Sequence, residues 1–482
     1  MSNRRIKLML LTIAACFLIL GACGAPDRAA DRARAGAPAW MMQGYTDALS
    51  YAPGDTVRFF ISSNLPRYQV RIMRVGLEQR SIHLRENIQG TVHPIPANAS
   101  THGCGWPETF SVQVGEDWPT GYYEAFLGAP DPADPNGWIE GQTIFFVVRP
   151  SQPGRNADIL LQMTTNTYNA YNGWGGHCYY ADQSRDGRTV PRVSFHRPIV
   201  SQAYQWELHF IRWAETHGYR LDYATNADLH ERPELLDHYK LVLSVGHDEY
   251  WSAPMRDALE AYIARGGKVA FLGGNNVCWQ VRFEDDGATM VSYKTRFKDD
   301  PLYNPDGPNP LLTTLWGHHL VDRPENELTG VGYLRGGMHL EHGQFMDGSG
   351  ALTVHRPDHW VFEGAAVKEG DSFGGDHTIV GYECDGCEFE MVDGRPVPTH
   401  RDGTPRTFVI LATAPASWPA SDVEWYDRWE KGRIGAACLG IYTVPGGGTV
   451  FTASTTDWVH GLSGGDAVVE RVTRNVLDRL TR

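Results

Sequence analysis

Four short apolar runs in the middle of the chain alternate with segments of helical periodicity. In chain order, the runs and the helical segments are residues 159–163, 202–216, 221–224, 233–238, 240–245, 255–264 and 269–272. Strands that alternate with helices are typical of a parallel sheet covered by helices on both faces. We therefore expect a doubly wound α/β domain over residues 153–482, with turn-rich insertions at about 280–400.

Residues 39–152 show a different pattern, in which short alternating strands are separated by glycine, proline and asparagine. Candidate strands lie at residues 57–61, 68–72, 110–114, 122–127 and 143–148. Many short strands at this spacing predict a β-sandwich of the Ig-like kind. The expected fold class is therefore α/β with an appended N-terminal β-sandwich.

The first 38 residues indicate a targeting signal followed by a tether, and we expect both to lie outside the folded domains. A basic start precedes the apolar run 8–20, which is short for a membrane span and ends at Leu20-Gly21-Ala22-Cys23. Small residues before a cysteine are typical of bacterial lipoproteins. We expect residues 1–22 to be a signal peptide, Cys23 to carry lipid, and residues 23–38 to be disordered. An ordinary secretory signal is the alternative; either one places the body outside the cytoplasm.

The chain has 482 residues and an acidic balance, with 43 lysine and arginine residues against 57 aspartate and glutamate residues. A net charge of −14 disfavours binding to a nucleic-acid backbone. Six cysteines remain after the signal and the lipid site, and only Cys384 and Cys387 lie close together in sequence. An Asp-Gly turn between these two would let them face each other as a disulfide, and buried thiols are the alternative.

Three polar loops follow predicted strands of the α/β domain, at the carboxyl ends where such folds place their sites. They are residues 164–176, 246–252 and 273–276. The second loop runs from a strand into a helix and has His247 at its apex, where nucleophile-elbow enzymes have serine or cysteine. His247 and Glu249 are therefore candidates for a metal ligand or an acid–base group. The alternative is that the acidic residues of this loop only cap the following helix.

Five longer motifs occur along the chain in this order: TNTYNAY, VSFHRPI, LSVGHDEYWS, FLGGNNVCWQVR and TTDWVHGL. With these motifs the chain resembles the large (β) subunit of N,N-dimethylformamidase and its relatives, over most of its mature length. The resemblance implies a glutamine-amidotransferase-like α/β domain beside β-sandwich modules. It also implies hydrolysis of an amide-type C–N bond and one ferric ion, Fe(III), held by two tyrosinates and one glutamate.

The resemblance assigns these ligands motif by motif. Glu249 matches the carboxylate and Tyr168 matches one phenolate. Tyr123 is the best match for the second phenolate, and the neighbouring Tyr122 is the alternative. Phenolate and carboxylate are hard anionic oxygens, which suit a trivalent ion, and a bound cation would ionise a phenol that otherwise titrates near pH ~10.

Three further polar residues match catalytic or supporting positions of the family: His247, Asn275 and Lys294. In the implied reaction, the metal polarises the amide carbonyl and activates a water. His247 is expected to take the proton of the water or to give one to the leaving amine. Asn275 and Lys294 are expected to stabilise the developing oxyanion.

Two departures from the family pattern leave the substrate open. The known enzyme type carries a lectin-like jelly-roll segment and a small partner subunit, whereas only about 40 residues separate Arg80 from Trp118 here. The lipoprotein signal is the second departure, because it places this chain in the cell envelope. Dimethylformamide is therefore doubtful as the substrate.

Two functions of different class follow from the sequence. The first is a metal-dependent amide hydrolase acting on a small-molecule amide or a polymer. The second is a cell-envelope binding lipoprotein that holds a glycan or another polymer through the aromatic residues Trp174, Tyr179, Tyr180 and Trp279. Both place the chain on a membrane through Cys23 and exclude nucleic acid as a partner, and both leave a homo-oligomer open.

Overall fold

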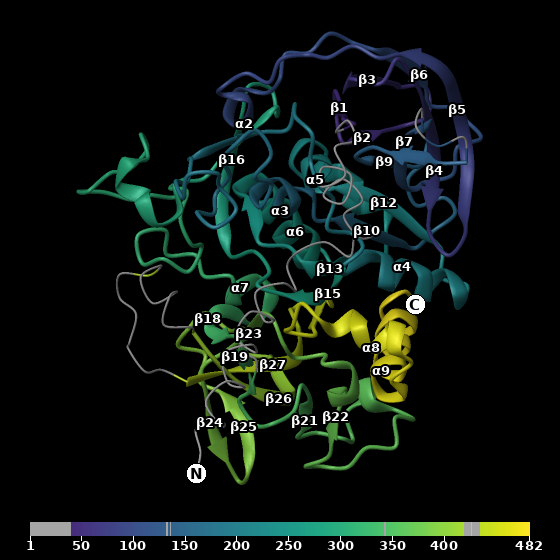
Figure 1. Ribbon diagram of the computed structural model, residues 1–482. Coiled ribbons are helices and arrows are strands. Elements are labelled where there is room, and N and C mark those ends of the chain that lie inside the picture. Colours follow the sequence, from purple (N-terminus) through teal and green to yellow (C-terminus); the bar gives the residue numbers. More distant parts are fainter. Residues whose placement is uncertain (1–39, 132–133, 135, 342–343, 419–425, 427–433) are drawn as a thin grey trace, which may run out of the picture.

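The computed structural model describes residues 40–482 apart from 132–133, 135, 342–343, 419–425 and 427–433 (Figure 1). The predicted signal, the tether and Cys23 lie outside these residues. Over the described part, no helix combines the length and the apolar character that a bilayer span requires. The described chain is rich in sheet, with antiparallel and mixed sheets and a smaller number of helices.

Two N-terminal sheets share one apolar core, and we call them together the sandwich. One sheet contains β1 (Met42–Thr46), β3 (Thr56–Ser63) and β6 (Phe110–Gln113), and the other contains β2 (Ser50–Tyr51), β9 (Ile144–Val148), β7 (Gly121–Pro130), β4 (Arg67–Val75), β5 (Gln79–Gln89) and β8 (Trp138–Glu140). Phe59 and Phe146 meet edge to face between the sheets, with ring centroids 6.3 Å apart. Alternate residues of β4, such as Val70 and Ile72, are buried because successive side chains of a strand point to opposite faces.

Nine strands form the central sheet of the rest of the chain. In spatial order they are β12 (Leu221–Thr225), β10 (Ile159–Met163), β13 (Leu241–His247), β15 (Lys268–Gly274), β28 (Thr449–Thr452), β27 (Ile434–Thr443), β26 (Val409–Ser417), β21 (Leu352–Val354) and β22 (Ser372–Phe373). The first five are parallel, and the last four pair antiparallel. The expected parallel sheet is therefore a mixed one. The five residues 444–448 that join β27 to β28 allow only antiparallel pairing, since a parallel crossover needs a dozen or more residues.

Helices cover both faces of the central sheet. They are α3 (Thr165–Ala170), α4 (Glu207–Thr216), α5 (Asn226–Glu231), η1 (Pro233–His238), α6 (Ala253–Ala264), α8 (Trp458–Gly464) and α9 (Ala467–Leu480). The side chains of α4, α8 and α9 share one core with residues of the sandwich, and those of α5 and α6 fill the core on the opposite face. Figure 1 shows the result, with the sandwich above the central sheet and the antiparallel strands below.

The region predicted as insertions contains short elements packed around the sheet edge. They are β16 (Trp279–Glu284), β17 (Thr289–Val291), η2 (Lys294–Asp299), α7 (Asn326–Thr329), β18 (Gly332–Gly337), β19 (Leu340–Glu341), β20 (Gln344–Phe345), η3 (Trp360–Phe362), η4 (Gly375–His377), β23 (Cys384–Gly386), β24 (Phe389–Val392) and β25 (Arg395–Pro398). β16 and β17 join a four-stranded sheet with β11 (Arg192–Ser194) and β14 (Tyr250–Ser252). The short α2 (Ala99–His102) packs against β11.

The six described cysteines are all buried free thiols. Cys384 and Cys387 do not bridge, because the expected Asp-Gly turn is part of strand β23, whose extended backbone does not fold Cys387 back onto Cys384. Cys384 lies in the core with α9, and Cys387 lies in the core with α6. The Asp385 carboxylate accepts hydrogen bonds from backbone amides of the loop 273–276, which holds β23 extended.

Candidate functional site

The carboxyl ends of three adjacent parallel strands bring the three polar loops to one place. β10, β13 and β15 are neighbours in the central sheet, and His247 at the end of β13 pairs with Gly274 at the end of β15. The Thr167 hydroxyl in α3 accepts the backbone N–H of Glu249 at 3.1 Å. The loops therefore surround a single spot at this edge of the sheet.

Glu249 is the centre of a cluster of polar side chains. Its carboxylate is fully buried and receives hydrogen bonds from the Tyr180 hydroxyl at 3.0 Å, Asn275 Nδ2 at 3.1 Å and Trp279 Nε1 at 3.2 Å. The Tyr171 ring stacks on that of Tyr180 with centroids 4.0 Å apart, and Tyr171 lowers the pKa of Glu249. Burial raises the pKa of Glu249, and nearby positive charge opposes that shift.

His247 lies between two buried carboxylates. Its Nε2 is 2.7 Å from Glu383 Oε2 and 3.3 Å from Glu249 Oε2. Burial lowers the pKa of the imidazole, but the two carboxylates outweigh burial and raise it to about 9. The rings of Trp206 and Tyr382 enclose the imidazole edge-on, at centroid distances of 5.4 and 5.8 Å.

Lys294 closes the cluster on the side of the tyrosines. Its Nζ donates to the Tyr250 hydroxyl at 3.0 Å, and that hydroxyl is 2.6 Å from the Tyr180 hydroxyl. The ammonium also lies over aromatic faces, 3.6 Å from the ring centroid of Tyr180 and 4.4 Å from that of Trp279. Burial lowers the pKa of Lys294 to about 8, and Glu249 partly opposes the change. A hydrogen-bonded path thus runs from Lys294 through two phenols to Glu249.

Three residues around the cluster hold left-handed backbone conformations that non-glycine residues rarely adopt. They are Asn275 (φ 50°), Val277 (φ 58°) and Lys294 (φ 51°). Such strain persists only where surrounding contacts enforce it, and it concentrates at functional sites. Here the contact is the Asp385 carboxylate, which binds the backbone N–H of Asn275 at 3.0 Å.

The acidic residues of the 246–252 loop do not cap helix α6. Ser252 does so, because its hydroxyl accepts the backbone N–H of Met255. Asp248 is buried and accepts hydrogen bonds from Gln162, Asn226 and Ser244, which fixes the loop to β10 and α5. Asp248 is therefore a structural carboxylate, whereas Glu249 points into the cluster.

The structure brings together four of the six residues predicted for the site: His247, Glu249, Asn275 and Lys294. Tyr168 lies elsewhere, with its hydroxyl donating to the buried Glu207 carboxylate.

The sixth predicted residue, Tyr123, and its alternative, Tyr122, belong to the sandwich. Tyr123 donates to the Pro119 carbonyl at 2.6 Å and stacks on Trp118. The hydroxyl of Tyr122 is bonded to Glu124 and Ser201.

Four residues of the cluster were not predicted from the sequence as ligands or catalytic groups: Tyr171, Tyr180, Tyr250 and Glu383. Tyr250 follows Glu249 directly, and Tyr171 shares its motif with Tyr168. The sequence therefore contained the information needed to propose both tyrosines. Glu383 had no such signal, because it lies in the region predicted as insertions and reaches the site through the β23 backbone, which pairs with the loop after β28.

The aromatic residues proposed for glycan binding are mostly packed inside. Tyr179 and Trp279 are buried, and the Tyr179 hydroxyl donates to the Met290 carbonyl. Trp174 is half-buried and donates to Gln43 of the sandwich. These contacts fit packing, although Tyr179 and Tyr180 also border a surface hollow.

Within the described residues, no group of three or more His, Cys, Asp or Glu side chains is arranged to hold a metal ion. The Tyr180 hydroxyl, 3.0 Å from the Glu249 carboxylate, is an oxygen donor outside those four residue types.

Comparison with known proteins relates the chain to one family. The family described as N,N-dimethylformamidase beta subunit-like, C-terminal, matches residues 69–472. The N,N-dimethylformamidase beta subunit of Alcaligenes sp is 26% identical over 442 residues, which cover 79% of this chain and 55% of the relative. The corresponding subunit of Paracoccus aminophilus is 26% identical over 439 residues, with the same coverage. The chain thus spans about half the length of these relatives.

The matched segment includes every residue of the cluster around Glu249. It also includes most of the sandwich and all nine strands of the central sheet. Since the match covers far more than half of the sequence, the chain belongs to the N,N-dimethylformamidase beta subunit-like family.

Proposed function

We propose that the chain hydrolyses an amide-type C–N bond at the cluster around Glu249. The observation that carries the proposal is a fully buried carboxylate with a phenol, an imidazole and an ammonium group around it, at the carboxyl edge of a parallel sheet. Burying several charged groups together is costly and is repaid where it performs chemistry. Relatives named as N,N-dimethylformamidase beta subunits support an amide as the reacting group.

The cluster also fits a hard trivalent cation, and we propose Fe(III). Glu249, Tyr171 and Tyr180 offer one carboxylate and two phenols side by side. Burial raises the pKa of both phenols well above the usual value, and a cation would reverse that preference. These three residues would hold the ion. Tyr168 would not bind it, because its hydroxyl donates to Glu207. When bound, iron supplies Lewis-acid polarisation of the carbonyl and a lowered pKa for water.

His247 and Glu383 form the proton-transfer pair in this proposal. With a pKa raised to about 9, the imidazole is protonated at neutral pH, and its Nε2 lies 2.7 Å from Glu383 Oε2. The Glu383 carboxylate can accept the proton of an attacking water, and the imidazolium can give one to the leaving nitrogen. Trp206 and Tyr382 exclude bulk water from the imidazole.

Lys294 and Asn275 take different roles. Lys294 carries the ammonium that can stabilise negative charge on the carbonyl oxygen of the substrate. Asn275 Nδ2 already binds both Glu249 and Glu383, each at 3.1 Å, so it positions the two carboxylates. Asn275 Oδ1 is buried without a hydrogen-bond partner among the described residues, and it can accept the N–H of a bound amide.

The finer fold assignment and the cellular location are also proposals. The parallel strands β12, β10, β13 and β15 with their helices support a glutamine-amidotransferase-like sheet, and the two N-terminal sheets support an Ig-like sandwich. The motif that ends at Cys23 supports a lipid-anchored protein of the cell envelope. Partitioning of the full-length protein and of Cys23→Ser between detergent and water tests the anchor. Equal partitioning of both into water contradicts it.

The reaction is tested with a panel of linear amides and detection of the released amine. We expect the iron-loaded wild type to turn over one or more of them, and Glu249→Gln to lose at least about a hundredfold in kcat with an unchanged far-UV spectrum. Glu78→Gln, an exposed change of the same type, is the matched control. An iron-loaded wild type that hydrolyses no amide contradicts the proposal, and retained affinity for a glycan in that protein supports the binding function.

A further inference from the structure

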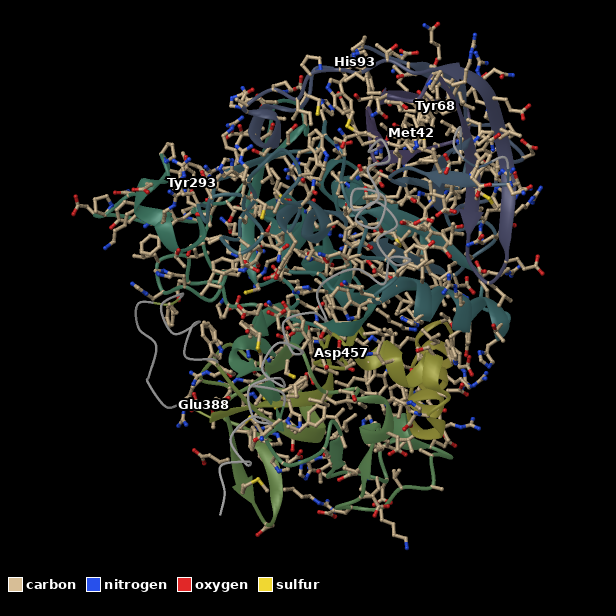
Figure 2. The ribbon with its side chains drawn as sticks, in the orientation of Figure 1. Met42, Tyr68, His93, Tyr293, Glu388 and Asp457 are labelled. Carbon is tan, nitrogen blue, oxygen red and sulfur yellow. The ribbon has the colours of Figure 1, made fainter. Side chains whose placement is uncertain are left out.

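A surface groove leads from the solvent to the outer edge of the cluster around Glu249, where Tyr180 and Lys294 lie. A hollow of about 400 Å³ is lined by Tyr179, Tyr180, Tyr293 and Lys294, and it continues into a second hollow of about 690 Å³. The two hollows share the wall formed by Thr189, Val190 and Arg296. Figure 2 shows Tyr293 on the left of the view, near the segment that projects from the molecule there.

At its inner end, the groove meets two residues of the cluster, Tyr180 and Lys294. Tyr180 lines the hollow and also donates its hydroxyl to the Glu249 carboxylate at 3.0 Å. Lys294 lines it too and contacts the ring of Tyr180. At about 30 Å³ per water, a hollow of 400 Å³ has room for about a dozen waters, which exceeds the need of an amide with five heavy atoms. The groove therefore accommodates a substrate with a longer arm.

The charges along the groove leave one cation unpaired. Arg188 is paired with Asp186, and His177 bonds to the same carboxylate. Asp182 is exposed and accepts from its neighbour Gln183. Arg296 is exposed and lines both hollows, and its guanidinium has neither a hydrogen bond nor an ion pair within the part of the chain that the structure describes.

The backbone that carries Arg296 is fixed. The N–H groups of Tyr293 and Lys294 bond to Thr313, and Thr313 bonds in turn to the Asp300 carboxylate. Asp300 also receives two hydrogen bonds from Arg282. A guanidinium on a fixed support loses little backbone entropy when it binds an anion, and its planar fork suits a carboxylate.

We propose that the substrate is an amide whose far end carries a carboxylate, which Arg296 recognises in the groove while the amide group lies at Glu249. The proposal rests on the proposed function, since it names the substrate class of the same site. The body of the substrate would lie against Tyr179, Tyr180 and Tyr293, which line the first hollow.

Two formamides of equal length test the proposal: N-formyl-4-aminobutyrate, which is anionic, and N-(4-hydroxybutyl)formamide, which is neutral. We expect the wild type to prefer the anionic compound about tenfold or more in kcat/KM, as expected for a hydrogen-bonded ion pair. Arg296→Gln should remove most of this preference through KM, and Arg296→Lys should restore part of it. Lys298→Gln, on the same segment but outside the groove lining, should keep the preference.

Calorimetric binding of the two compounds separates this inference from the proposed reaction. The wild type could hydrolyse neither compound but bind the anionic one more tightly, with Arg296→Gln abolishing the difference. That result supports the proposed anion site and contradicts the proposed reaction. If the wild type hydrolyses or binds both compounds equally, or if Arg296→Gln keeps the preference, the anion site is overturned. Failure of the anionic compound to bind or react overturns it as well.

Discussion

At the scale of single residues, the direction of a side chain decides which tyrosine belongs to the site. Tyr168 and Tyr171 lie three positions apart in one motif, so the sequence alone allows either tyrosine to be the ligand. In the structure, Phe145 of the sandwich packs edge-on against Tyr168, and Glu207 accepts its hydroxyl. Both partners come from distant parts of the chain, so a pattern within the motif cannot reveal them.

The residues that could be predicted are those whose position follows from a strand end. His247, Glu249 and Asn275 directly follow strands that the apolar runs already indicate. Lys294 came only from the family resemblance, and Glu383 was missed. Both lie in the region without clear periodicity, where tertiary contacts fix the backbone.

Glu325 gives a prediction at the residue scale. It is buried, its Oε1 accepts the Tyr333 N–H at 3.1 Å, and its Oε2 has no hydrogen-bond partner among the described residues. Burial raises the pKa of its carboxyl to about 7. The folded protein therefore binds this proton more tightly than the unfolded chain, whose glutamates titrate near pH ~4.3. The stability that this bound proton contributes is therefore lost as the pH rises from about 4.3 to about 7.

Glu325→Gln keeps the side chain neutral at every pH. We expect the free energy of unfolding of the variant, relative to the wild type, to increase by on the order of 3 kcal/mol between pH 4 and 8. Urea titrations at several pH values measure this difference, with the exposed Glu78→Gln as the control. A difference that does not change with pH contradicts the assigned shift.

At the scale of elements, two glycines let the ends of β13 and β15 approach closely. Gly246 pairs with Gly273 in the ladder, and a Cβ on Gly273 would lie 2.4 Å from the Gly246 carbonyl oxygen. Gly246 itself has φ 83°, and a Cβ there would lie 2.3 Å from Cβ of Trp206. The close approach places His247 between its two carboxylates.

Gly246→Ala is therefore expected to destabilise the protein by about 2 to 5 kcal/mol. Roughly 1–2 kcal/mol comes from the left-handed backbone and about 1–3 kcal/mol from the clash with Trp206. Gly218→Ala is the matched control, since Gly218 has φ 78° and nothing within 4 Å of the added Cβ. Guanidinium unfolding midpoints compare the two. Equal losses in both variants would rule out the contact with Trp206 as the cause.

The elements themselves were predicted where their pattern is local. The apolar runs and helical periods located β10, β13, β15 and α6 within a few residues. The long hairpin strand β5 was missed because its residues are mostly exposed and polar, so they carry no apolar alternation. The Asp-Gly pair in β23 was misread as a turn, because the partners that hold it extended lie about 110 residues earlier in the chain.

At the scale of the whole molecule, the sandwich and the central sheet share one core. Val75, Tyr122 and Phe145 of the sandwich belong to the same buried cluster as residues of α4 and β10. An ion pair from Arg74 to Glu215 on α4 joins the same surfaces. Composition and periodicity predicted the two parts separately, but the way they pack depends on side chains whose partners lie far away in the sequence. That packing turns Tyr168 toward Glu207.

The central claim, that the cluster around Glu249 is the metal and reaction site, is tested most directly by iron content measured together with visible absorption. The wild type purified with iron supplied is expected to hold one Fe(III) and to show a tyrosinate-to-iron band. Tyr171→Phe and Tyr180→Phe should each weaken the band and lower the iron content, whereas Tyr168→Phe should keep both. Loss of iron in Tyr168→Phe, with full iron in the other two variants, would contradict the account.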